Sequence, residues 1–370
     1  MLIAGGFALF GDTDIETILR DYICGSGELL FSGVDLRLGY VWISASPICW
    51  HCVLFLLGQW CRPIGYLERI AWSAVGNLEP NHSVRIRGEK SLKREGGESR
   101  TIAQLREHYE IEKELADKLR HASKEERARL YASCYDELFV RVPHHPQNAR
   151  KADVQTRRTA IGVQLDLLAQ FIRSDSIFME IGAGDCSLSM ELAKRVAKVF
   201  AVDVSKEITD GGNRPANFKL LLSDGSSIPL PRNTVNVAYS YQLMEHLHPD
   251  DAYEQIGNIH ATLVSGGRYV CITPNRLSGP HDVSKYFDPV ATGFHLQEYL
   301  VSELAEVFKR VGFSKVNLCV RIKGLYLRLP VLPVTWLEKL LLKLPATLRR
   351  QLAGRCPFTQ LLGINIIALK

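Results

Sequence analysis

Residues Phe178–Cys186 have the sequence "FMEIGAGDC", and this stretch decides how the chain folds. An apolar run leads into a Gly-Ala-Gly turn, and an apolar pattern at helical spacing follows it, at Leu188, Leu192 and Val196. Glycine permits positive φ and a close approach of the backbone to a bound group. A strand, a glycine turn and a helix in this order therefore predict a ligand-binding loop at the end of a strand.

Seven short apolar runs alternate with helical segments from about Ala160 onward. The runs are "SIFMEIG", "KVFAVDV", "NFKLLLS", "VNVAYS", "GRYVCIT", "KVNLCVRI" and "GINIIAL". Continuous apolar strands separated by helices are typical of a mostly parallel sheet that is covered on both faces. We therefore predict a doubly wound α/β fold with a mostly parallel, seven-stranded sheet, in which ligands bind beyond the carboxyl ends of the strands.

The loop residues distinguish between two cofactors, a nicotinamide dinucleotide and an adenosyl sulfonium. The dinucleotide fingerprint requires another glycine three residues after Gly184, where this chain has Ser187. Glu180 would place negative charge near a pyrophosphate, but it suits the α-ammonium group of a methionine moiety. Asp185 can cap the helix that follows Gly182 and Gly184. The loop favours the sulfonium cofactor.

Two more acidic residues follow predicted strands. Asp203, in "AVDVS", can accept hydrogen bonds from both ribose hydroxyls, although nicotinamide enzymes share this feature and the residue can also be a loop-capping Asp. Asp224 and Gly225, in "LLSDGSSIPLP", lie where an adenine edge would bind. There a carboxylate accepts from the exocyclic amine and an amide donates to a ring nitrogen, but "SDG" alone is equally typical of a turn.

The order of these motifs resembles a known family. The segments are "EIGAGDC", "AVDVS", "SDGSSIPLP", "VNVAYSYQLMEHL", "SGGRYVCITPNRLSGPHD" and "GFHLQEYLVSELAEVFKRVGF". They resemble the class I S-adenosylmethionine-dependent methyltransferases, and most of all the bacterial small-molecule branch that includes the quinone-biosynthesis enzymes. The resemblance covers about residues 160–313, with a last strand near Gly363, and it implies a Rossmann-like methyltransferase fold.

The resemblance also implies roles for individual residues. The residues implied to bind the cofactor are Glu180, Gly182, Gly184 and Asp185 in the methionine loop, Asp203 at the ribose, Asp224 and Gly225 at the adenine, and Ser240 at the end of the fourth strand. Two positions depart from the family pattern. Cys186 stands where many members have a third glycine, and Asn236 stands where an aspartate is common, a change that we interpret as structural.

Candidate catalytic residues follow the fourth and fifth strands. His246, in "LMEHLHPDD", could orient or deprotonate an acceptor, although a hydrogen-bonded histidine at a helix start is an equal interpretation. His281, in "SGPHDVSKYF", is a second candidate, and loop packing is its alternative role. Glu245, His248, Asp282, Tyr286 and His295 lie in the same two segments. Methyl transfer from a sulfonium does not require a base, because positioning and exclusion of water can supply much of the effect.

The chain divides into three parts. Residues 1–90 contain no lysine before Lys90, and we interpret them as an atypical extension, either disordered or outside the native coding sequence. Residues 91–159 are predicted to form a linker and helical cap, with capping boxes that begin helices at about 102–121 and 124–139. Residues 160–370 form the predicted cofactor-binding domain. Residues 324–357 are a helical insertion in it, and its basic, amphipathic sequence would either contact an anionic membrane, frame a lipophilic acceptor or pack on the domain.

Composition limits the setting and the partners. The net charge of +5 argues against a nucleic-acid substrate, and the scattered cysteines indicate reduced thiols in a cytoplasmic protein without a secretory signal. The apolar stretch Val41–Trp60 has the length of a membrane span but is interrupted by polar residues. "CWHC", residues 49–52, lacks a second complete ligand pair, so no metal site is predicted. The oligomeric state is left open.

We therefore expect a methyltransferase that uses S-adenosylmethionine. Its predicted acceptor is a small molecule, a glycan or a lipid intermediate, and neither the acceptor nor the acceptor atom is identified by the sequence. Three other functions remain as alternatives: an NAD-dependent oxidoreductase, a cofactor-binding module without transfer activity, and a membrane-attached scaffold.

Overall fold

The computed structural model describes most of the chain after residue 97. The described residues are 98, 100–146, 154–205, 214–322 and 324–370, together with two short strands at 34–35 and 40–42. Apart from these strands, the predictions for residues 1–90, for the apolar stretch Val41–Trp60 and for "CWHC" lie outside the described residues. Within the described part of the chain, no helix is both long enough and apolar enough to cross a bilayer.

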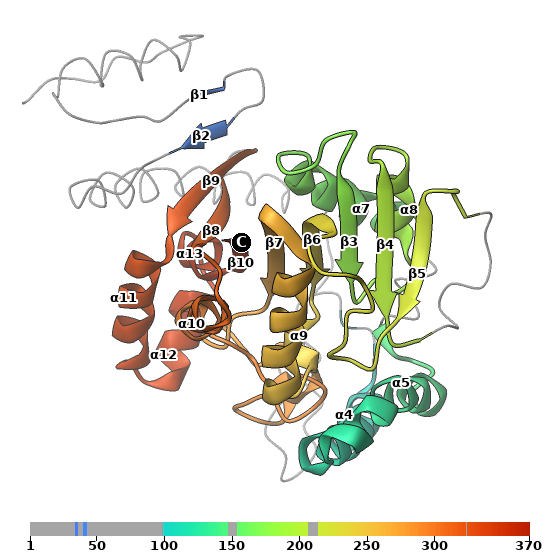
Figure 1. The fold of residues 1–370 in the computed structure, drawn as a ribbon. Helices are drawn as coiled ribbons and strands as arrows, with labels where there is room; N and C mark the ends of the chain where they lie inside the picture. The colour runs from blue at the N-terminus through green and yellow to red at the C-terminus, as the bar shows by residue number, and fades with distance from the viewer. Residues whose placement is uncertain are drawn as a thin grey trace, which may run out of the picture.

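Ten strands form one mixed sheet, in the order β1-β2-β9-β8-β10-β7-β6-β3-β4-β5 (Figure 1). Their bounds are β1 Val34–Asp35, β2 Tyr40–Trp42, β3 Ile177–Ile181, β4 Lys198–Asp203, β5 Phe218–Leu222, β6 Val235–Tyr241, β7 Leu263–Thr273, β8 Lys315–Ile322, β9 Leu325–Pro330 and β10 Ile364–Leu369. Strands β3 to β7 pair in parallel, whereas β10 pairs antiparallel with β7 and β8, and β8 pairs antiparallel with β9. The doubly wound α/β class is confirmed, but the prediction of seven mostly parallel strands is wrong.

Strand β9 accounts for part of this difference. The prediction assigned Leu325–Pro330 to a helical insertion, yet these residues pair with β8 from Ile322↔Leu325 to Asn317↔Pro330. The turn before β9 includes Gly324, whose φ of 86° suits the primed turns of short hairpins. The helical part of the insertion therefore starts only after Pro330.

Helices cover both faces of the sheet (Figure 1). Their bounds are α4 Ile102–His121, α5 Lys124–Arg141, α7 Val154–Leu168, α8 Ser187–Ala193, α9 Pro249–Thr262, α10 Val301–Val311, α11 Val331–Leu342, α12 Ala346–Ala353 and α13 Phe358–Leu362, with short 3₁₀ helices η2 Met244–His246 and η3 Val283–Tyr286. Successive residues of β3 point to opposite faces, because side chains alternate along a strand. Phe178 packs in the core with α7 and α8, whereas Met179 packs in the core with α9 and α10.

Helices α4 and α5 lie beyond the carboxyl ends of β3 and β4 (Figure 1). Both predicted capping boxes are present. The Thr101 hydroxyl accepts from the Gln104 amide at 3.2 Å, and the Ser123 hydroxyl accepts from the Glu126 amide at 3.3 Å. In each box the second side chain accepts from the backbone N–H of the capping residue, so the helix starts are fixed by local sequence.

The insertion is joined to the domain by a buried acid. Glu338, on α11, is fully buried and accepts from the backbone amides of Val301 and Ser302 at 2.7 and 3.0 Å. These amides begin α10 and have no partner within their own helix. Asn275 also donates to Glu338, at 3.1 Å. A carboxylate from one helix thus caps the start of another, where negative charge is favourable.

Candidate functional site

One cavity of about 640 Å³ lies beyond the carboxyl ends of β3 and β4. It is lined at the sheet edge by Gly182, Gly184, Asp185, Asp203, Ser223 and Gly225, on α5 by Tyr131, Tyr135 and Phe139, and also by Arg157, Gln242, Leu243 and His246, among others. The position agrees with the rule that open α/β sheets bind ligands at this edge. The volume lies in the range of roughly 300–1,000 Å³ that is usual for small-ligand sites.

The glycine loop forms the floor of the cavity. Gly182 and Gly184 have φ of 70° and 51°, and a Cβ on Gly182 would lie 3.0 Å from a methyl group of Leu243. Cys186 also has a positive φ, of 57°, so the residue that replaces the third glycine adopts a glycine-like conformation. Asp185 accepts from the amide of Ser187 at 3.0 Å, which places a carboxylate at the start of α8.

Asp203 is held by the backbone of two loops. One of its carboxylate oxygens accepts from the amide of Gly184 at 2.8 Å, and the other accepts from the amide of Ser205 at 3.1 Å. Burial raises its pKa although these bonds lower it. A carboxylate can accept about four hydrogen bonds, so each oxygen retains capacity for a ligand hydroxyl. Asp203 therefore lies in the cavity in a form suited to a ribose.

Glu180 lies outside the cavity lining. It is buried on the same face of β3 as Phe178, and its carboxylate accepts from the hydroxyl of Ser189 on α8 at 2.5 Å. Burial raises the pKa of Glu180 to about 8. The structure therefore places this side chain beneath the glycine loop, and its role at the α-ammonium group stays a prediction.

Asp224 and Ser240 also lie outside the lining residues. Asp224 is exposed and accepts from the amides of Ser226 and Ser227 at 3.0 and 2.7 Å, which is a turn interaction. Ser240 is fully buried, and its hydroxyl lies 2.8 Å from that of Tyr269. Gly225 does line the cavity, with φ of 102°. The role of Asp224 at an adenine and of Ser240 at the cofactor remain predictions.

Helix α5 forms a wall that the sequence analysis missed. Tyr131, Tyr135 and Phe139 recur at intervals of four and all line the cavity. Residues four apart lie on one face of a helix, so this aromatic spacing in the sequence could have predicted the wall. A Cβ on Gly225 would lie 2.5 Å from the ring of Tyr131, so the absence of a side chain at Gly225 lets the wall approach the sheet edge.

A buried ion pair attaches this wall to α9. Arg127 donates to both carboxylate oxygens of Asp251, at 2.6 and 2.7 Å, and the Tyr131 hydroxyl also donates to Asp251, at 2.7 Å. The side chains of Arg127 and Asp251 are only 7% and 4% exposed. Burial alone would raise the pKa of Asp251, but these partners lower it. A charged Asp251 therefore holds α5 over the cavity.

His246 is the only predicted catalytic residue that lines the cavity among the residues described. Its Nδ1 lies 3.0 Å from the carbonyl oxygen of Phe294, which can only accept, so the proton is on Nδ1 and the lone pair is on Nε2. Burial and the neighbouring His295 lower the pKa of His246 to about 3. His246 is therefore neutral at physiological pH and a weak proton acceptor.

The structure does not bring His281 to this cavity. Its ring Nε2 lies 3.0 Å from the carbonyl oxygen of Asn275, and the side chain is exposed. Tyr286 donates to Glu98 at 3.1 Å. His295, by contrast, is buried with its ring 5.0 Å from that of His246. Of the candidates after the fifth strand, only His295 lies against a residue of the cavity wall.

Comparisons with known proteins agree with this arrangement. Residues 178–267 match a family described as "Methyltransferase domain". Over 89 residues the chain is 30% identical to a probable S-adenosylmethionine-dependent methyltransferase of Mycolicibacterium smegmatis, which covers 24% of this chain and 32% of that protein. The chain thus spans about a third of the length of this curated relative.

Solved structures give more distant similarities. A methyltransferase from Archaeoglobus fulgidus matches with a TM-score of 0.40 and 16% identity, over 58% of this chain and 94% of that one. Phosphoethanolamine N-methyltransferase 1 from Haemonchus contortus matches with a TM-score of 0.39 and 15% identity, over 53% of this chain and 42% of that one.

The structure shows a doubly wound α/β fold with a cavity at the sheet edge, of a size that suits a small ligand. The family match makes this more specific. Residues 178–267 match a methyltransferase-domain family, and the relative from Mycolicibacterium smegmatis is described as S-adenosylmethionine-dependent. The cavity fits that cofactor, because Asp203 and the glycine loop meet in it. The comparisons do not distinguish the quinone-biosynthesis branch from other branches.

Proposed function

We propose that the protein transfers a methyl group from S-adenosylmethionine to a small-molecule, glycan or lipid acceptor, as in the small-molecule branch that its motifs resemble. One observation carries the proposal. A single cavity joins the glycine loop and Asp203 on one side to the aromatic wall of α5 and His246 on the other. An adenosyl cofactor and an acceptor can therefore lie next to each other in it.

We assign the cofactor to the sheet side of the cavity. Gly182, Gly184, Asp185, Asp203 and Gly225 line this side and would contact the cofactor. The remaining predicted residues would act one layer further out: Glu180 supports the loop through Ser189, Asp224 shapes the turn that presents Gly225, and Ser240 packs at the end of β6.

We assign the acceptor to the side formed by α5 and η2. When bound, S-adenosylmethionine supplies an electrophilic methyl group with a thioether as leaving group. Tyr135 and Phe139 give the acceptor an apolar surface, and the ring of Tyr135 also stacks on Phe294 with centroids 4.8 Å apart. Because His246 is a weak base, it would orient the acceptor through Nε2, and positioning would provide most of the rate increase. The placement of His281 gives no support to a catalytic role.

Calorimetric titration of the full chain with S-adenosylmethionine, S-adenosylhomocysteine and NAD tests the assignment. We expect both adenosyl ligands to bind and NAD not to bind. Asp203→Ala should weaken binding at least about 10-fold, or 1.4 kcal/mol. Asp175→Ala is the matched control, since Asp175 is an exposed carboxylate that precedes β3, whereas the glycine loop follows the other end of this strand. NAD binding without the adenosyl ligands would overturn the assignment, and cofactor binding without transfer to any acceptor tested would favour a non-catalytic binding module.

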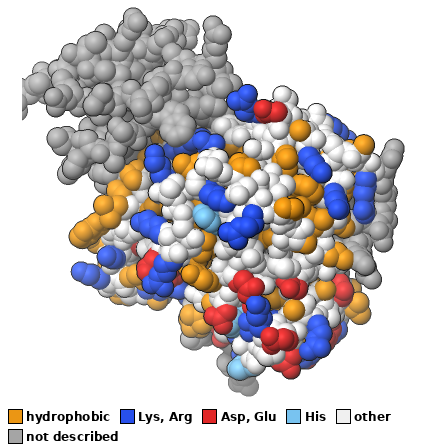
Figure 2. All heavy atoms as spheres, in the orientation of Figure 1, with side chains coloured by type: hydrophobic (Ala, Val, Ile, Leu, Met, Phe, Trp, Pro, Cys, Tyr) orange, Lys and Arg blue, Asp and Glu red, His pale blue; other side chains and the backbone are white. Residues whose placement is uncertain are grey.

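We also propose that the insertion contacts an anionic membrane surface and that the protein is otherwise cytoplasmic. Leu332, Trp336 and Leu340 recur at intervals of four on α11 and are 67%, 65% and 64% exposed. Figure 2 shows orange side chains next to blue ones over α11 and α12, and Lys339 and Lys343 lie in the same segment. An apolar stripe flanked by basic residues is typical of helices that lie in a membrane interface.

Flotation with liposomes separates this proposal from simple packing. The wild-type protein should float with vesicles that contain phosphatidylglycerol, and Trp336→Ser with Leu340→Ser should reduce the bound fraction. Val163→Ser changes an exposed apolar residue on α7 and serves as control. Equal flotation of all three proteins, or none with the wild type, would contradict membrane contact.

A further inference from the structure

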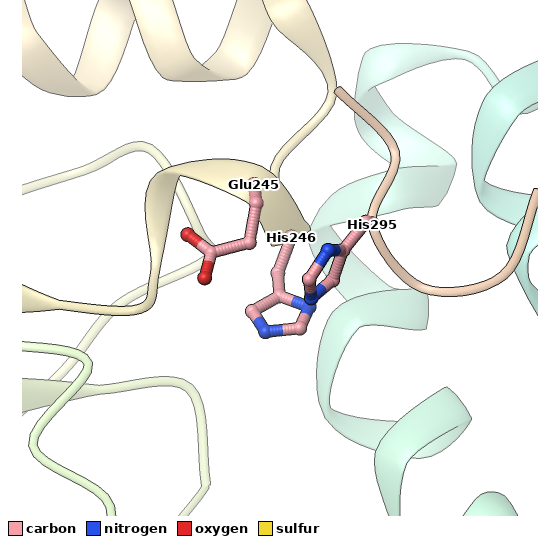
Figure 3. A group of neighbouring side chains, drawn as sticks. All are labelled: Glu245, His246 and His295. Carbon is pink, nitrogen blue, oxygen red and sulfur yellow. The ribbon is translucent and has the colours of Figure 1, made fainter. Parts of the chain in front are cut away.

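Three side chains of metal-binding types meet beside the cavity (Figure 3). Glu245 and His246 belong to η2, and His295 belongs to the segment between η3 and α10. One ligand atom from each residue lies within 4.8 Å of the other two. Glu245 and His295 are buried, and His246 is half-buried at the cavity wall. The group thus brings one carboxylate and two imidazoles together out of bulk water.

Both imidazoles have the orientation that metal ligands require. The Nδ1 of His246 donates to the carbonyl oxygen of Phe294 at 3.0 Å, and the Nδ1 of His295 donates to a carboxylate oxygen of Glu298 at 2.7 Å. Each bond fixes the ring and puts the lone pair on Nε2. A histidine ligand in metal sites usually donates its other nitrogen to a carboxylate or a backbone carbonyl in this way.

Glu245 supplies an independent observation. The residue is 0% exposed, and one carboxylate oxygen accepts from the Thr273 hydroxyl at 2.7 Å. The other oxygen, Oε1, is buried without a hydrogen-bond partner in the described part of the chain. A buried acceptor that stays unsatisfied is costly and uncommon. Coordination of a cation would satisfy it.

The surrounding charge also favours a cation. Glu298 accepts a hydrogen bond from His295 at 2.7 Å, and Glu245 and Asp282 lie close enough to interact with His295 electrostatically. All three acids are buried. Several buried carboxylates close to one another require compensating positive charge, which a bound cation can provide.

We propose that Glu245, His246 and His295 bind a divalent first-row transition cation, for which Zn²⁺ is the best fit. Two imidazoles and one carboxylate suit Zn²⁺, whereas Mg²⁺ and Ca²⁺ prefer oxygen ligands throughout. Three protein ligands leave a fourth position open in a tetrahedral site. His246 lines the cavity, so this open position would face the acceptor side. The cation site does not depend on methyl transfer, but a bound cation would occupy the Nε2 lone pair of His246, and the open coordination position would then contact the acceptor in place of His246.

Binding would require a small contraction of the group. Ligands around tetrahedral Zn²⁺ lie about 3.4 Å apart, given bonds of about 2.1 Å. The ligand atoms lie within 4.8 Å here, so the side chains would draw together. In Figure 3 the rings of His246 and His295 lie next to each other, whereas the carboxylate of Glu245 is turned away from them and would have to swing toward the rings.

The test uses the full chain with Cys49→Ser and Cys52→Ser, which removes the thiols of "CWHC" as competing ligands. The protein is dialysed against a chelator and titrated with Zn²⁺ by calorimetry. We expect one equivalent to bind, with affinity at least about 10-fold weaker in Glu245→Gln and in His295→Gln. His121→Gln, an exposed histidine on α4, is the matched control and should bind as well as its parent.

Zinc-edge X-ray absorption on the titrated parent protein keeps the test valid even if a variant fails to fold. We expect a shell of about four nitrogen or oxygen atoms at about 2.0–2.1 Å, with two imidazoles and no sulfur. The proposal would be overturned if the parent does not bind Zn²⁺ or if its shell contains no imidazole. It would also be overturned if Glu245→Gln and His295→Gln bind Zn²⁺ as tightly as the parent. Binding of S-adenosylhomocysteine to the same samples reports separately on the proposed function.

Discussion

One side of the cavity is formed mainly by backbone atoms and the other by side chains. The sheet side consists mainly of backbone, in which Gly182 and Gly184 turn the chain and the Gly184 amide meets Asp203. The opposite side consists of side chains, namely the aromatic wall of α5, its ion pair with Asp251, and His246. A backbone site tolerates much variation in sequence, whereas a site of side chains changes with each substitution. The first side therefore indicates the cofactor, and the second would determine the acceptor.

The largest expected effect is on the attachment of the wall. Arg127→Ala leaves the Asp251 carboxylate buried without its cation, so we expect the free energy of unfolding to fall by about 3–5 kcal/mol. Denaturation in urea measures this loss in the free energy of unfolding relative to the wild type. Arg129→Ala, an exposed arginine of the same helix, should change stability by less than about 0.5 kcal/mol. A loss below about 1 kcal/mol in Arg127→Ala would show that the wall holds by apolar packing.

The second effect concerns the support beneath the glycine loop. Burial raises the pKa of Glu180 in the folded protein to about 8, from an ordinary value of about 4.5. The stability that such a group contributes is fully present below its pKa in the unfolded state. It is lost as the pH rises through the folded pKa of about 8. Glu180→Gln keeps the shape and the bond to Ser189 but cannot ionise. From about pH 5 to pH 8, its stability relative to the wild type should rise by up to about 1.4 kcal/mol per pH unit.

Unfolding curves of both proteins at several pH values across this range check the prediction. The difference between the two proteins isolates Glu180, because the other titrating groups are common to both. Parallel stability curves would show that Glu180 is ionised in the folded protein. That result would return it to a role in binding a positively charged cofactor group.

The third prediction compares the stability lost by an alanine substitution at each of two glycines of the loop. Gly182→Ala and Gly184→Ala both place an alanine in the left-handed region, at a cost of about 1–2 kcal/mol each. Only at Gly182 would the new Cβ also press on Leu243, at 3.0 Å, while the space at Gly184 is open. Gly182→Ala should therefore be less stable than Gly184→Ala, by about 1 kcal/mol in thermal or urea unfolding. The reverse order would mean that Leu243 moves aside freely.

The smallest effect is expected for Asn236→Asp, on β6 beside the start of β3. The Asn236 side chain accepts from the backbone amide of Ile177 at 2.7 Å, which joins β6 to the start of β3. Asn236→Asp retains an acceptor and should unfold within about 0.5 kcal/mol of the wild type. Asn236→Leu leaves the Ile177 amide unpaired and should cost about 1–3 kcal/mol. Equal losses in both variants would contradict our structural interpretation of this position.

The sequence predicts much of the backbone side of the molecule. All seven apolar runs are strands, and both capping boxes form, because these features depend on local pattern and on hydrogen bonds between neighbours. Strand β9 was missed because its pairing depends on a turn that includes Gly324 and on β8, not on its own apolar pattern. The sequence also placed the two glycines and Asp203 at the cavity correctly. Gly182 and Gly184 follow β3 and Asp203 ends β4, so recognising these strands was enough to locate them.

The side-chain half of the site was less accessible to sequence analysis. Glu180 precedes the loop by two residues, yet alternation along β3 turns it toward α8, and the sequence does not say which face borders the cavity. His246 and His295 are separated by 48 residues in the chain, and only the packing of η2 on the later segment brings them together. The aromatic residues of α5 have a helical spacing that the sequence shows. That spacing does not say that they face the cavity or that α5 is attached to α9.

The carboxylate of Glu338 has a consequence for how the protein can be divided. Since it caps α10 from within α11, a fragment that ends before residue 331 would leave the first amides of α10 without this acceptor. It would also remove β10, the strand that lies between β7 and β8 in the sheet. The insertion and the rest of the α/β domain should accordingly melt in a single transition, and shortened versions for crystallisation or screening should retain the chain through Lys370.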